Sequence, residues 1–210
     1  MPQRETYETQ NLKQEGATTD PFTVERYAQF SRHFPSTARS VLDVGCSDGR
    51  GGVRLKELRP DIALSGLDCV ESRLADLPPA YENHILGLST KIPADDLTFD
   101  VIVAGEFLEH LYPADVDATL CEFQRVLKIG GRLLMTTPHP TCWLNRFGGR
   151  TVYGISHLTQ HHPKTLITRL LMHGFNKVVL RGSGKATRNF GERFPLLALY
   201  GSYLIRADKI

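Results

Sequence analysis

The chain has 210 residues and a mass of 23.5 kDa, which is the size of one ordinary domain. Hydrophobic residues make up 41% and charged residues 23%, so the composition predicts a globular core and excludes disorder, collagen-like repeats and coiled coil. No apolar run reaches the roughly 18 residues that a membrane helix needs. Residues 1–16 lack the apolar stretch of a secretory signal. We therefore expect a cytoplasmic protein with no membrane span.

The four cysteines lie far apart, without a Cys-x-x-Cys pair. This spacing predicts reduced thiols and argues against a structural zinc site.

The formal net charge of +2 hides an uneven distribution. Residues 1–138 hold 14 Lys and Arg against 21 Asp and Glu, whereas residues 139–210 hold 11 Lys and Arg against only Glu192 and Asp208. The basic part either offsets an acidic body or forms a positive surface that meets a nucleotide, a pyrophosphate or an RNA backbone.

Apolar runs alternate with helical patterns along the first two thirds of the chain. An amphipathic pattern over 22–34 predicts a leading helix. Short apolar runs predict buried parallel strands at 40–45, 62–68, 83–88, 99–105 and 131–138. Helical patterns lie between them at 49–59, 71–77 and 113–127, the last with Pro113 in its first turn and Gly130–Gly131 at its end. This alternation predicts an α/β doubly wound sheet with ligands at the carboxyl ends of its strands.

The pattern changes after Pro138. Residues 139–162 are predicted to form a loop or small insertion, 163–173 a helix that Gly174 ends, and 176–181 a strand. A basic loop with glycines follows at 181–195, and 196–207 is a final strand region that Gly201 interrupts.

The segment VLDVGCSDGRGG (41–52) gives the strongest functional signal. Glycines in a turn between a strand and a helix let a ligand lie against the backbone, near free N–H groups. A dinucleotide site would use G-x-G-x-x-G. Here Asp43 precedes the turn and Asp48 lies within it. Two carboxylates disfavour a pyrophosphate, which argues against a nicotinamide oxidoreductase. The same carboxylates suit a cofactor with an amine and a positive charge.

A further acid stands where the second predicted strand ends. Asp68 lies roughly 20 residues beyond the turn, where a carboxylate can accept both hydroxyls of a ribose. The alternative is that Asp68 only caps the next helix.

Together these motifs resemble the class I S-adenosylmethionine-dependent methyltransferases, over about residues 39–182. VLDVGCSDGRGG is similar to their first motif, GLD ending in Asp68 to the second, FDVIVAGEFLEHL to the fourth, and LCEFQRVLKIGGRLLMTTP to the following helix and fifth strand. The resemblance implies a Rossmann-like, mostly parallel seven-stranded sheet with an antiparallel C-terminal strand. It implies one methyltransferase domain over 1–210, with an N-terminal lid or helix (1–38), a cofactor-binding core (39–138) and a basic substrate-side region (139–210).

The resemblance also implies how S-adenosyl-L-methionine is bound. Residues around the methionine part would be Asp43, Gly45, Cys46, Ser47 and Gly49, with Asp68 on the ribose, Cys69 against the adenine and Glu106 facing the cofactor. Ser47 departs from the middle glycine of the usual G-x-G-x-G. An acid that meets the adenine amine in many members is also missing, so Ser89 or a backbone carbonyl would take its place.

The motif GEFLEHL suggests a second set of functional residues. If this motif is helical, its face with Glu106, Glu109 and His110 can hold a divalent cation. In the alternative interpretation, Glu106 faces the cofactor and Glu109–His110 cap the turn. HLTQHHPKTLITRLLMHGF resembles a segment of these enzymes in which His157 would lie above the methyl group. The set Glu106, Glu109, His110 and His157 resembles the metal site of small-RNA 3′-end 2′-O-methyltransferases and ubiquinone-pathway O-methyltransferases, which implies Mg²⁺ or another divalent cation.

The reaction chemistry favours an oxygen acceptor. A sulfonium methyl is already activated and needs in-line placement, but a hydroxyl also needs a base or a metal. We expect His110 or His157 to be that base, with His139 as the third candidate. An equally good interpretation makes His139 a turn residue between two prolines.

The basic region suggests the class of acceptor. Together with Trp143 and Tyr153 it would suit a sugar nucleotide, a lipid-pyrophosphate glycan or an RNA end. Because no separate RNA-binding region is present, we expect a small acceptor that is anionic or glycan-linked, with aromatic or polyketide-type acceptors next. The alternatives are an RNA 2′-O-methyltransferase and a catalytically silent partner subunit. The basic residues are Arg146, Arg150, Arg181, Lys185, Arg188 and Arg193.

Overall fold

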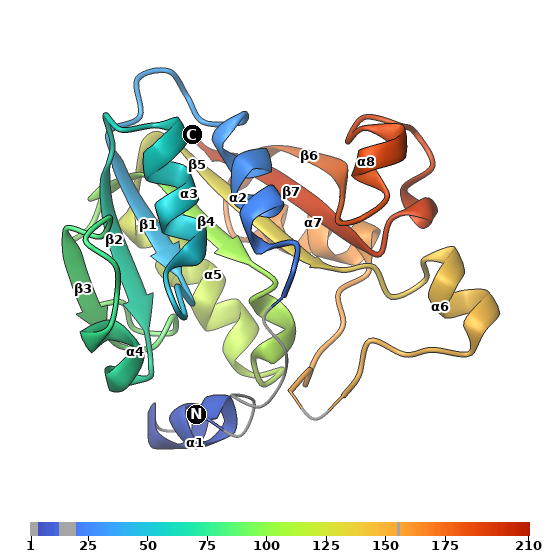
Figure 1. Ribbon diagram of the computed structural model, residues 1–210, viewed down its shortest axis with the longest axis horizontal. Helices are drawn as coiled ribbons and strands as arrows, with labels where there is room; N and C mark the ends of the chain where they lie inside the picture. The colour runs from blue at the N-terminus through green and yellow to red at the C-terminus, as the bar shows by residue number, and fades with distance from the viewer. Residues whose placement is uncertain (1–3, 13–19, 155) are drawn as a thin grey trace.

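The computed structural model describes residues 4–12, 20–154 and 156–210. Its centre is a seven-stranded sheet in the order β3-β2-β1-β4-β5-β7-β6 (Figure 1). The strands from β3 to β5 run parallel, and β7 is antiparallel to both β5 and β6. This topology confirms the predicted fold class. The strands are β1 (Ser40–Val44), β2 (Ala63–Asp68), β3 (Asn83–Leu86), β4 (Phe99–Gly105), β5 (Leu127–Pro138), β6 (Phe175–Ser183) and β7 (Ser202–Lys209).

Helices cover both faces of the sheet because successive strand residues point to opposite sides. In β1, Val41 packs in a hydrophobic cluster with α2 and α3, whereas Leu42 packs in a second cluster with α5 and α7. Within the described ranges, no helix is long and apolar enough to cross a membrane. The helices are α1 (Arg4–Leu12), α2 (Thr23–Ser31), α3 (Arg50–Leu58), α4 (Glu71–Ala75), α5 (Asp115–Val126), α6 (Trp143–Gly148), α7 (Pro163–Met172) and α8 (Thr187–Phe190), with 3₁₀ turns η1 (Leu108–His110) and η2 (Leu197–Leu199).

Several boundaries differ from the sequence prediction. The predicted loop at 139–162 contains α6, which ends where Gly149 adopts a left-handed conformation with φ of 61°. The predicted loop at 181–195 contains α8, and β7 begins only after Gly201. Helix α5 ends before the Gly130–Gly131 pair, because Leu127 is already extended and starts β5.

Helix α1 lies beyond the carboxyl ends of β2 and β3 (Figure 1). The buried side chain of Tyr7 holds this helix against the core. Its hydroxyl donates a 2.6 Å hydrogen bond to Asp115 and accepts a 3.0 Å hydrogen bond from the Tyr112 N–H. The N-terminal segment 1–38 was predicted to act as a lid. Residues 1–3 and 13–19 lie outside the described ranges, so the lid function and the division into segments stay predictions.

Candidate active site

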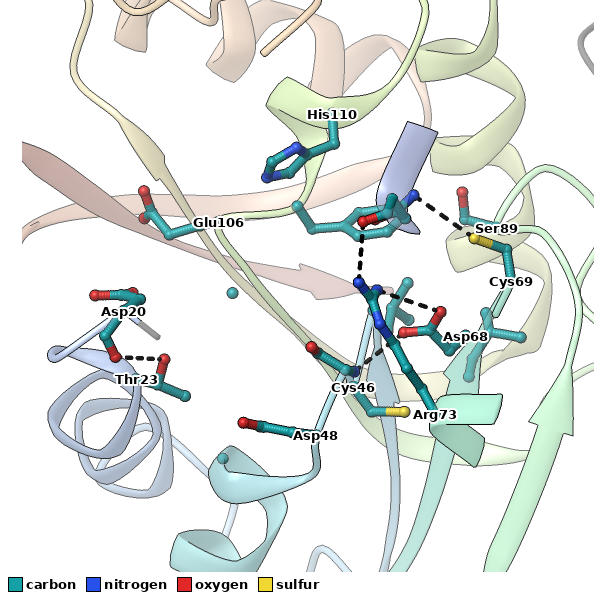
Figure 2. A pocket seen from close by; sticks show the side chains of 18 of the residues that line it. Asp20, Thr23, Cys46, Asp48, Asp68, Cys69, Arg73, Ser89, Glu106 and His110 are labelled. Atoms are coloured by element: carbon teal, nitrogen blue, oxygen red, sulfur yellow. Dashed lines mark hydrogen bonds and ion pairs between the residues drawn. The ribbon is translucent and has the colours of Figure 1, made fainter. Parts of the chain in front are cut away.

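A cavity of about 790 Å³ opens at the carboxyl ends of β1, β2 and β4 (Figure 2). This volume is typical of sites for small molecules and cofactors. The turn after β1, the ends of β2 and β3, the segment after β4, and parts of α1 and α2 form its walls. The cavity therefore lies at the sheet edge where an α/β fold is expected to bind its ligand.

The turn after β1 exposes its backbone to the cavity because its glycines carry no side chain. Neighbouring aromatic rings leave no room for one. A Cβ atom on Gly45 would lie 2.7 Å from the Phe107 ring, and one on Gly51 would lie 2.4 Å from the Tyr27 ring. Ser47 replaces the middle glycine but still adopts a φ of 51°. Its N–H donates a 3.1 Å hydrogen bond to Asp68, which holds the backbone in this strained conformation.

Asp68 lies at the end of β2 and lines the cavity. Its carboxylate is buried and accepts the N–H groups of Ser47 and Val70, and the Arg73 guanidinium lies 3.9 Å away (Figure 2). Asp68 therefore organises the loop before α4 and also presents its carboxylate to the cavity, so the two roles considered from the sequence are compatible.

Cys69 and Ser89 lie on the same side of the cavity as Asp68 (Figure 2). The Cys69 carbonyl accepts a 3.0 Å hydrogen bond from Arg4, and Asn11 lies 3.7 Å from its sulfur, so α1 covers this end. Burial raises the pKa of the Cys69 thiol to about 12, which keeps it protonated. Ser89 is buried and shares a 2.8 Å hydrogen bond with the Thr119 hydroxyl.

Asp43 and Gly49 do not lie on the cavity wall, although the resemblance placed both beside the cofactor. Asp43 is fully buried, and its two carboxylate oxygens accept hydrogen bonds of 2.6 Å from the hydroxyls of Tyr27 and Tyr81. Burial raises the pKa of Asp43 to about 6. Gly49 starts α3 with a φ of 76°. Both residues therefore support the turn without lining the cavity.

Glu106 does not share a helical face with Glu109 and His110, contrary to one of the two sequence interpretations; it lines the cavity, which agrees with the other. It adopts a φ of 50°, and its N–H bonds to the carbonyl of Thr136 on β5, so helical geometry begins only at η1. Its carboxylate accepts a 3.1 Å hydrogen bond from Ser202 and lies 3.7 Å from Arg26. Glu106 lines the cavity, and Figure 2 shows its side chain to one side of His110.

Glu109, His110 and His157 do come together, with one possible ligand atom of each within 4.8 Å of the others. The two imidazole rings lie 4.9 Å apart at 81°. Glu109 is fully buried; one carboxylate oxygen accepts a hydrogen bond from Thr137, and Oε1 has no partner among the described residues. The structure thus unites three of the four residues predicted to bind a metal.

The imidazole tautomers follow from backbone contacts. Nδ1 of His110 lies 2.9 Å from the carbonyl of Ser156, and Nδ1 of His157 lies 2.9 Å from that of Val152. A carbonyl only accepts, so each Nδ1 carries hydrogen and Nε2 of a neutral ring carries the lone pair. Burial and the neighbouring His157 lower the pKa of His110 to about 4, so it is neutral at pH 7. Burial and Glu106 raise the pKa of Glu109 well above its usual range.

His139, the third predicted base, lies away from the cavity lining. Its ring is buried, packs edge-on against Tyr203 at 5.7 Å, and accepts a 3.2 Å hydrogen bond from the Thr141 N–H. These contacts agree with its alternative interpretation as a turn residue.

The sequence predicted an N-terminal lid or helix over 1–38 but did not indicate which of its residues line the cavity. Arg26 of α2 is buried against it, 2.7 Å from Asp20 and near Glu106. An arginine on the buried face of the predicted amphipathic helix was the available signal. Other cavity residues that the sequence did not indicate are Tyr7, Asn11, Phe22, Thr23, Tyr27, Arg73, Phe107 and Ser202.

Comparisons with known proteins agree with this site. A family model described as a methyltransferase domain matches residues 42–135. A probable S-adenosylmethionine-dependent methyltransferase of Mycolicibacterium smegmatis is 31% identical over 59% of this chain and 51% of its own length. A malonyl-[acyl-carrier protein] O-methyltransferase of Herminiimonas arsenicoxydans is 31% identical over 53% of this chain and 41% of its own length. The chain thus spans about half or less of these relatives.

Solved structures share the fold along nearly the whole chain. A SAM-dependent methyltransferase from Archaeoglobus fulgidus superposes with a TM-score of 0.72 at 20% identity, covering 95% of this chain and 98% of that one. An N-methyltransferase from Bradyrhizobium japonicum, solved with S-adenosyl-L-homocysteine, gives 0.66 at 18% identity, covering 97% and 98%. The stretch that matches the methyltransferase domain model, 42–135, contains the glycine turn and Asp68. The chain resembles the class I S-adenosylmethionine-dependent methyltransferases in fold and, over residues 42–135, in sequence.

Proposed function

We propose that this chain transfers the methyl group of S-adenosylmethionine to a hydroxyl of a small acceptor, with a sugar or nucleotide sugar as the first choice. The observation that carries the proposal is the cluster of Glu109, His110 and His157 beside the cofactor cavity. An amine acceptor that is neutral at the working pH needs only placement, whereas a hydroxyl needs help to lose its proton. Two imidazoles on the cavity wall and a buried carboxyl beside them supply groups suited to that task.

The residues present fit the cofactor. The open backbone at Gly45 offers close approach, and Asp68 presents a carboxylate that suits ribose hydroxyls. Cys69 and Ser89 would lie at the adenine end, and Glu106 with Arg26 at the methionine end, where the carboxylate and guanidinium suit the amine and carboxylate of an amino acid. The bound cofactor supplies an electrophilic methyl group, and these residues hold it while the cavity walls exclude water.

The histidine cluster also fits a divalent cation. Glu109 Oε1 has no partner among the described residues, and both imidazoles have Nδ1 committed to the backbone, an arrangement that is typical of metal-binding histidines. A divalent cation held here would acidify and orient the acceptor hydroxyl. A proton on Glu109 would be displaced on binding, since ligands must be deprotonated.

The alternative is that a histidine acts directly as the base. A general base works best when its pKa lies near the working pH, and a pKa of about 4 makes His110 a weak proton acceptor. The low pKa favours His110 as a neutral ligand over His110 as the base. We therefore favour the cation-assisted reaction, with Glu106 on the cofactor side.

The charge of the chain supports an anionic acceptor. The 11 Lys and Arg of residues 139–210 face only two acids in the same segment, and His157 belongs to this region. Positive potential from this part of the chain would raise the local concentration of anionic substrates. Among the relatives, the names malonyl-[acyl-carrier protein] O-methyltransferase and 2-methyl-6-phytyl-1,4-hydroquinone methyltransferase show how far acceptors vary.

The test combines titration calorimetry with a methyl-transfer assay. S-adenosylhomocysteine is titrated with and without Mg²⁺ or Mn²⁺, and radiolabelled cofactor is then offered with a panel of sugar nucleotides. We expect binding that Asp68→Ala weakens at least about tenfold, and transfer that His110→Ala and His157→Ala lower by roughly 10²-fold or more. His162→Gln, an exposed histidine at the start of α7, is the matched control. Binding without transfer to any hydroxyl acceptor would contradict the proposal and favour a silent subunit.

A further inference from the structure

The segment between β5 and α7 carries apolar side chains into the solvent. Residues 140–154, here called the arm, extend away from the sheet and include α6 (Figure 1). The helix buries none of its side chains: Trp143 is 45% exposed, Leu144 68% and Phe147 80%. Leu144 and Phe147 are three residues apart, and Trp143 and Phe147 four apart, so these side chains share one face. An exposed group of large apolar side chains marks a surface that contacts a partner.

A second segment extends this surface. Helix α6 packs against η2, and the residues just before η2 include the exposed side chains of Phe194 and Leu196. Phe194 also packs against Phe190, with ring centroids 5.3 Å apart. The apolar surface is therefore built from two loops at the same end of the molecule rather than from one isolated helix.

The arm is also positively charged. Arg146 and Arg150 are exposed, and neither forms an ion pair with any residue of the described ranges. Residues 139–191 contain eight Lys and Arg and no Asp or Glu. The apolar face is thus bordered by Arg146 and Arg150, which form no ion pair within the described part of the chain, and this is the pattern of a surface that meets negative charge.

We propose that the arm docks this protein on an anionic lipid surface. Phe, Leu and Trp side chains on a protruding element can enter the headgroup region of a bilayer, while arginines beside them meet lipid phosphates. Each basic residue near an anionic membrane adds to this attraction. Since no described helix can cross a membrane, the contact is interfacial. The proposal concerns binding alone and stands independently of the methyl acceptor.

Two other occupants fit the arm less well. A second copy of the chain would bring the same unpaired arginines face to face, which disfavours association. A nucleic acid strand would meet the aromatic and arginine side chains, but stacking offers nothing to the aliphatic Leu144 and Leu196. An anionic bilayer satisfies the aliphatic, aromatic and cationic side chains together.

The docking surface connects directly to the cavity wall. The carbonyl of Val152, in the arm, accepts the hydrogen bond from His157 Nδ1 at 2.9 Å, and His157 lines the cavity. The arm is therefore joined to the cavity wall through His157.

The chain carries its own reporter for this test, because Trp143 is its single tryptophan. The full chain is mixed with vesicles of phosphatidylcholine, with and without phosphatidylglycerol, while tryptophan emission and co-sedimentation are followed. We expect a blue shift and sedimentation with the anionic vesicles, and weaker binding as salt is raised or when phosphatidylglycerol is left out.

Three variants separate the contributions. Leu144→Ser with Phe147→Ser, and separately Arg146→Glu with Arg150→Glu, should each lower the partition coefficient at least about tenfold. Met172→Ser removes an 81% exposed apolar side chain from α7 and should leave it unchanged. All three should bind S-adenosylhomocysteine like the parent chain, which shows that they fold.

Three results would overturn the proposal. Emission that does not respond to anionic vesicles excludes docking by the arm. A blue shift that follows protein concentration without vesicles assigns the surface to a second copy. Tighter binding to a single-stranded RNA oligonucleotide than to the vesicles assigns it to nucleic acid.

Discussion

Tyr27 of α2 donates a 2.6 Å hydrogen bond to Asp43 of β1, and both side chains are buried beneath the cofactor turn. The bond links α2 to β1, the strand that leads into the turn. Tyr27→Phe should destabilise the fold by about 1–3 kcal/mol, because it removes one of two hydroxyl donors from a buried carboxylate. Chemical denaturation measures this change. An unchanged free energy of unfolding would show that Asp43 needs only Tyr81.

Gly51 provides the space that Tyr27 fills. A Cβ atom at Gly51 would lie 2.4 Å from the Tyr27 ring, so Gly51→Ala should cost about 1–3 kcal/mol of stability and weaken S-adenosylhomocysteine binding. Gly154→Ala is the matched control, because a Cβ atom there has no neighbour within 4 Å. Thermal unfolding and calorimetry on both variants test the prediction; equal effects would contradict it.

Asp43 should also shape the pH dependence of stability. Its pKa in the folded state is raised from 3.8 to about 6 by burial, so between these values the folded chain binds more protons than the unfolded chain. Its contribution is therefore fully present below pH 4 and is lost as pH rises through about 6, by up to ~3 kcal/mol.

The variant Asp43→Asn isolates this effect. Between pH 4 and 7 the unfolding free energy of this variant should fall less steeply, or rise more steeply, than that of the parent chain. The remaining carboxylates titrate in both proteins, so only the difference between the two curves reports on Asp43. Urea denaturation at several pH values measures the difference. Parallel curves would show that Asp43 has an ordinary pKa.

The histidine cluster makes a prediction that does not depend on any acceptor. If Glu109, His110 and His157 bind a divalent cation, then Mn²⁺ or Mg²⁺ should raise the melting temperature, with a stabilisation of RT ln(1 + [L]/Kd). His110→Ala should abolish the shift, whereas His162→Gln, an exposed histidine outside the cluster, should keep it. Equal shifts in both variants would place the cation elsewhere.

Local sequence patterns were enough to predict the sheet and the cofactor turn. Buried strands such as 99–105 are short apolar runs, and the turn at 45–49 is marked by glycines whose positive φ few other residues tolerate. The predicted position of Asp68 at the end of β2 follows from the same rule. These features depend on neighbours in sequence, which a single chain displays.

Features that depend on distant contacts were harder to predict. Glu106 was expected on a helical face, but a hydrogen bond from its N–H to Thr136 on another strand diverts the backbone. The tyrosine pair on Asp43 joins residues 16 and 38 positions away, and no local pattern reveals it. His139 resembles a site residue in sequence, yet its packing against Tyr203 removes it from the cavity.

Tyr7 offers the sharpest test of the predicted N-terminal lid. Its hydroxyl joins α1 to the core through Asp115 and the Tyr112 N–H, and the same helix places Asn11 on the cavity wall. Tyr7→Phe removes both hydrogen bonds and leaves the ring packing intact. If α1 closes over the cofactor, the Kd for S-adenosylhomocysteine should rise roughly 5- to 30-fold, since losing a buried bond costs about 1–2 kcal/mol.

The control for this variant is Glu5→Gln, an exposed position on the same helix, which should bind like the parent chain. Faster dissociation with an unchanged association rate would show that α1 retains the bound cofactor, because mutations in a closed binding site act mainly on the off-rate. Equal Kd values for Tyr7→Phe and Glu5→Gln would show that α1 packs beside the cavity without closing it.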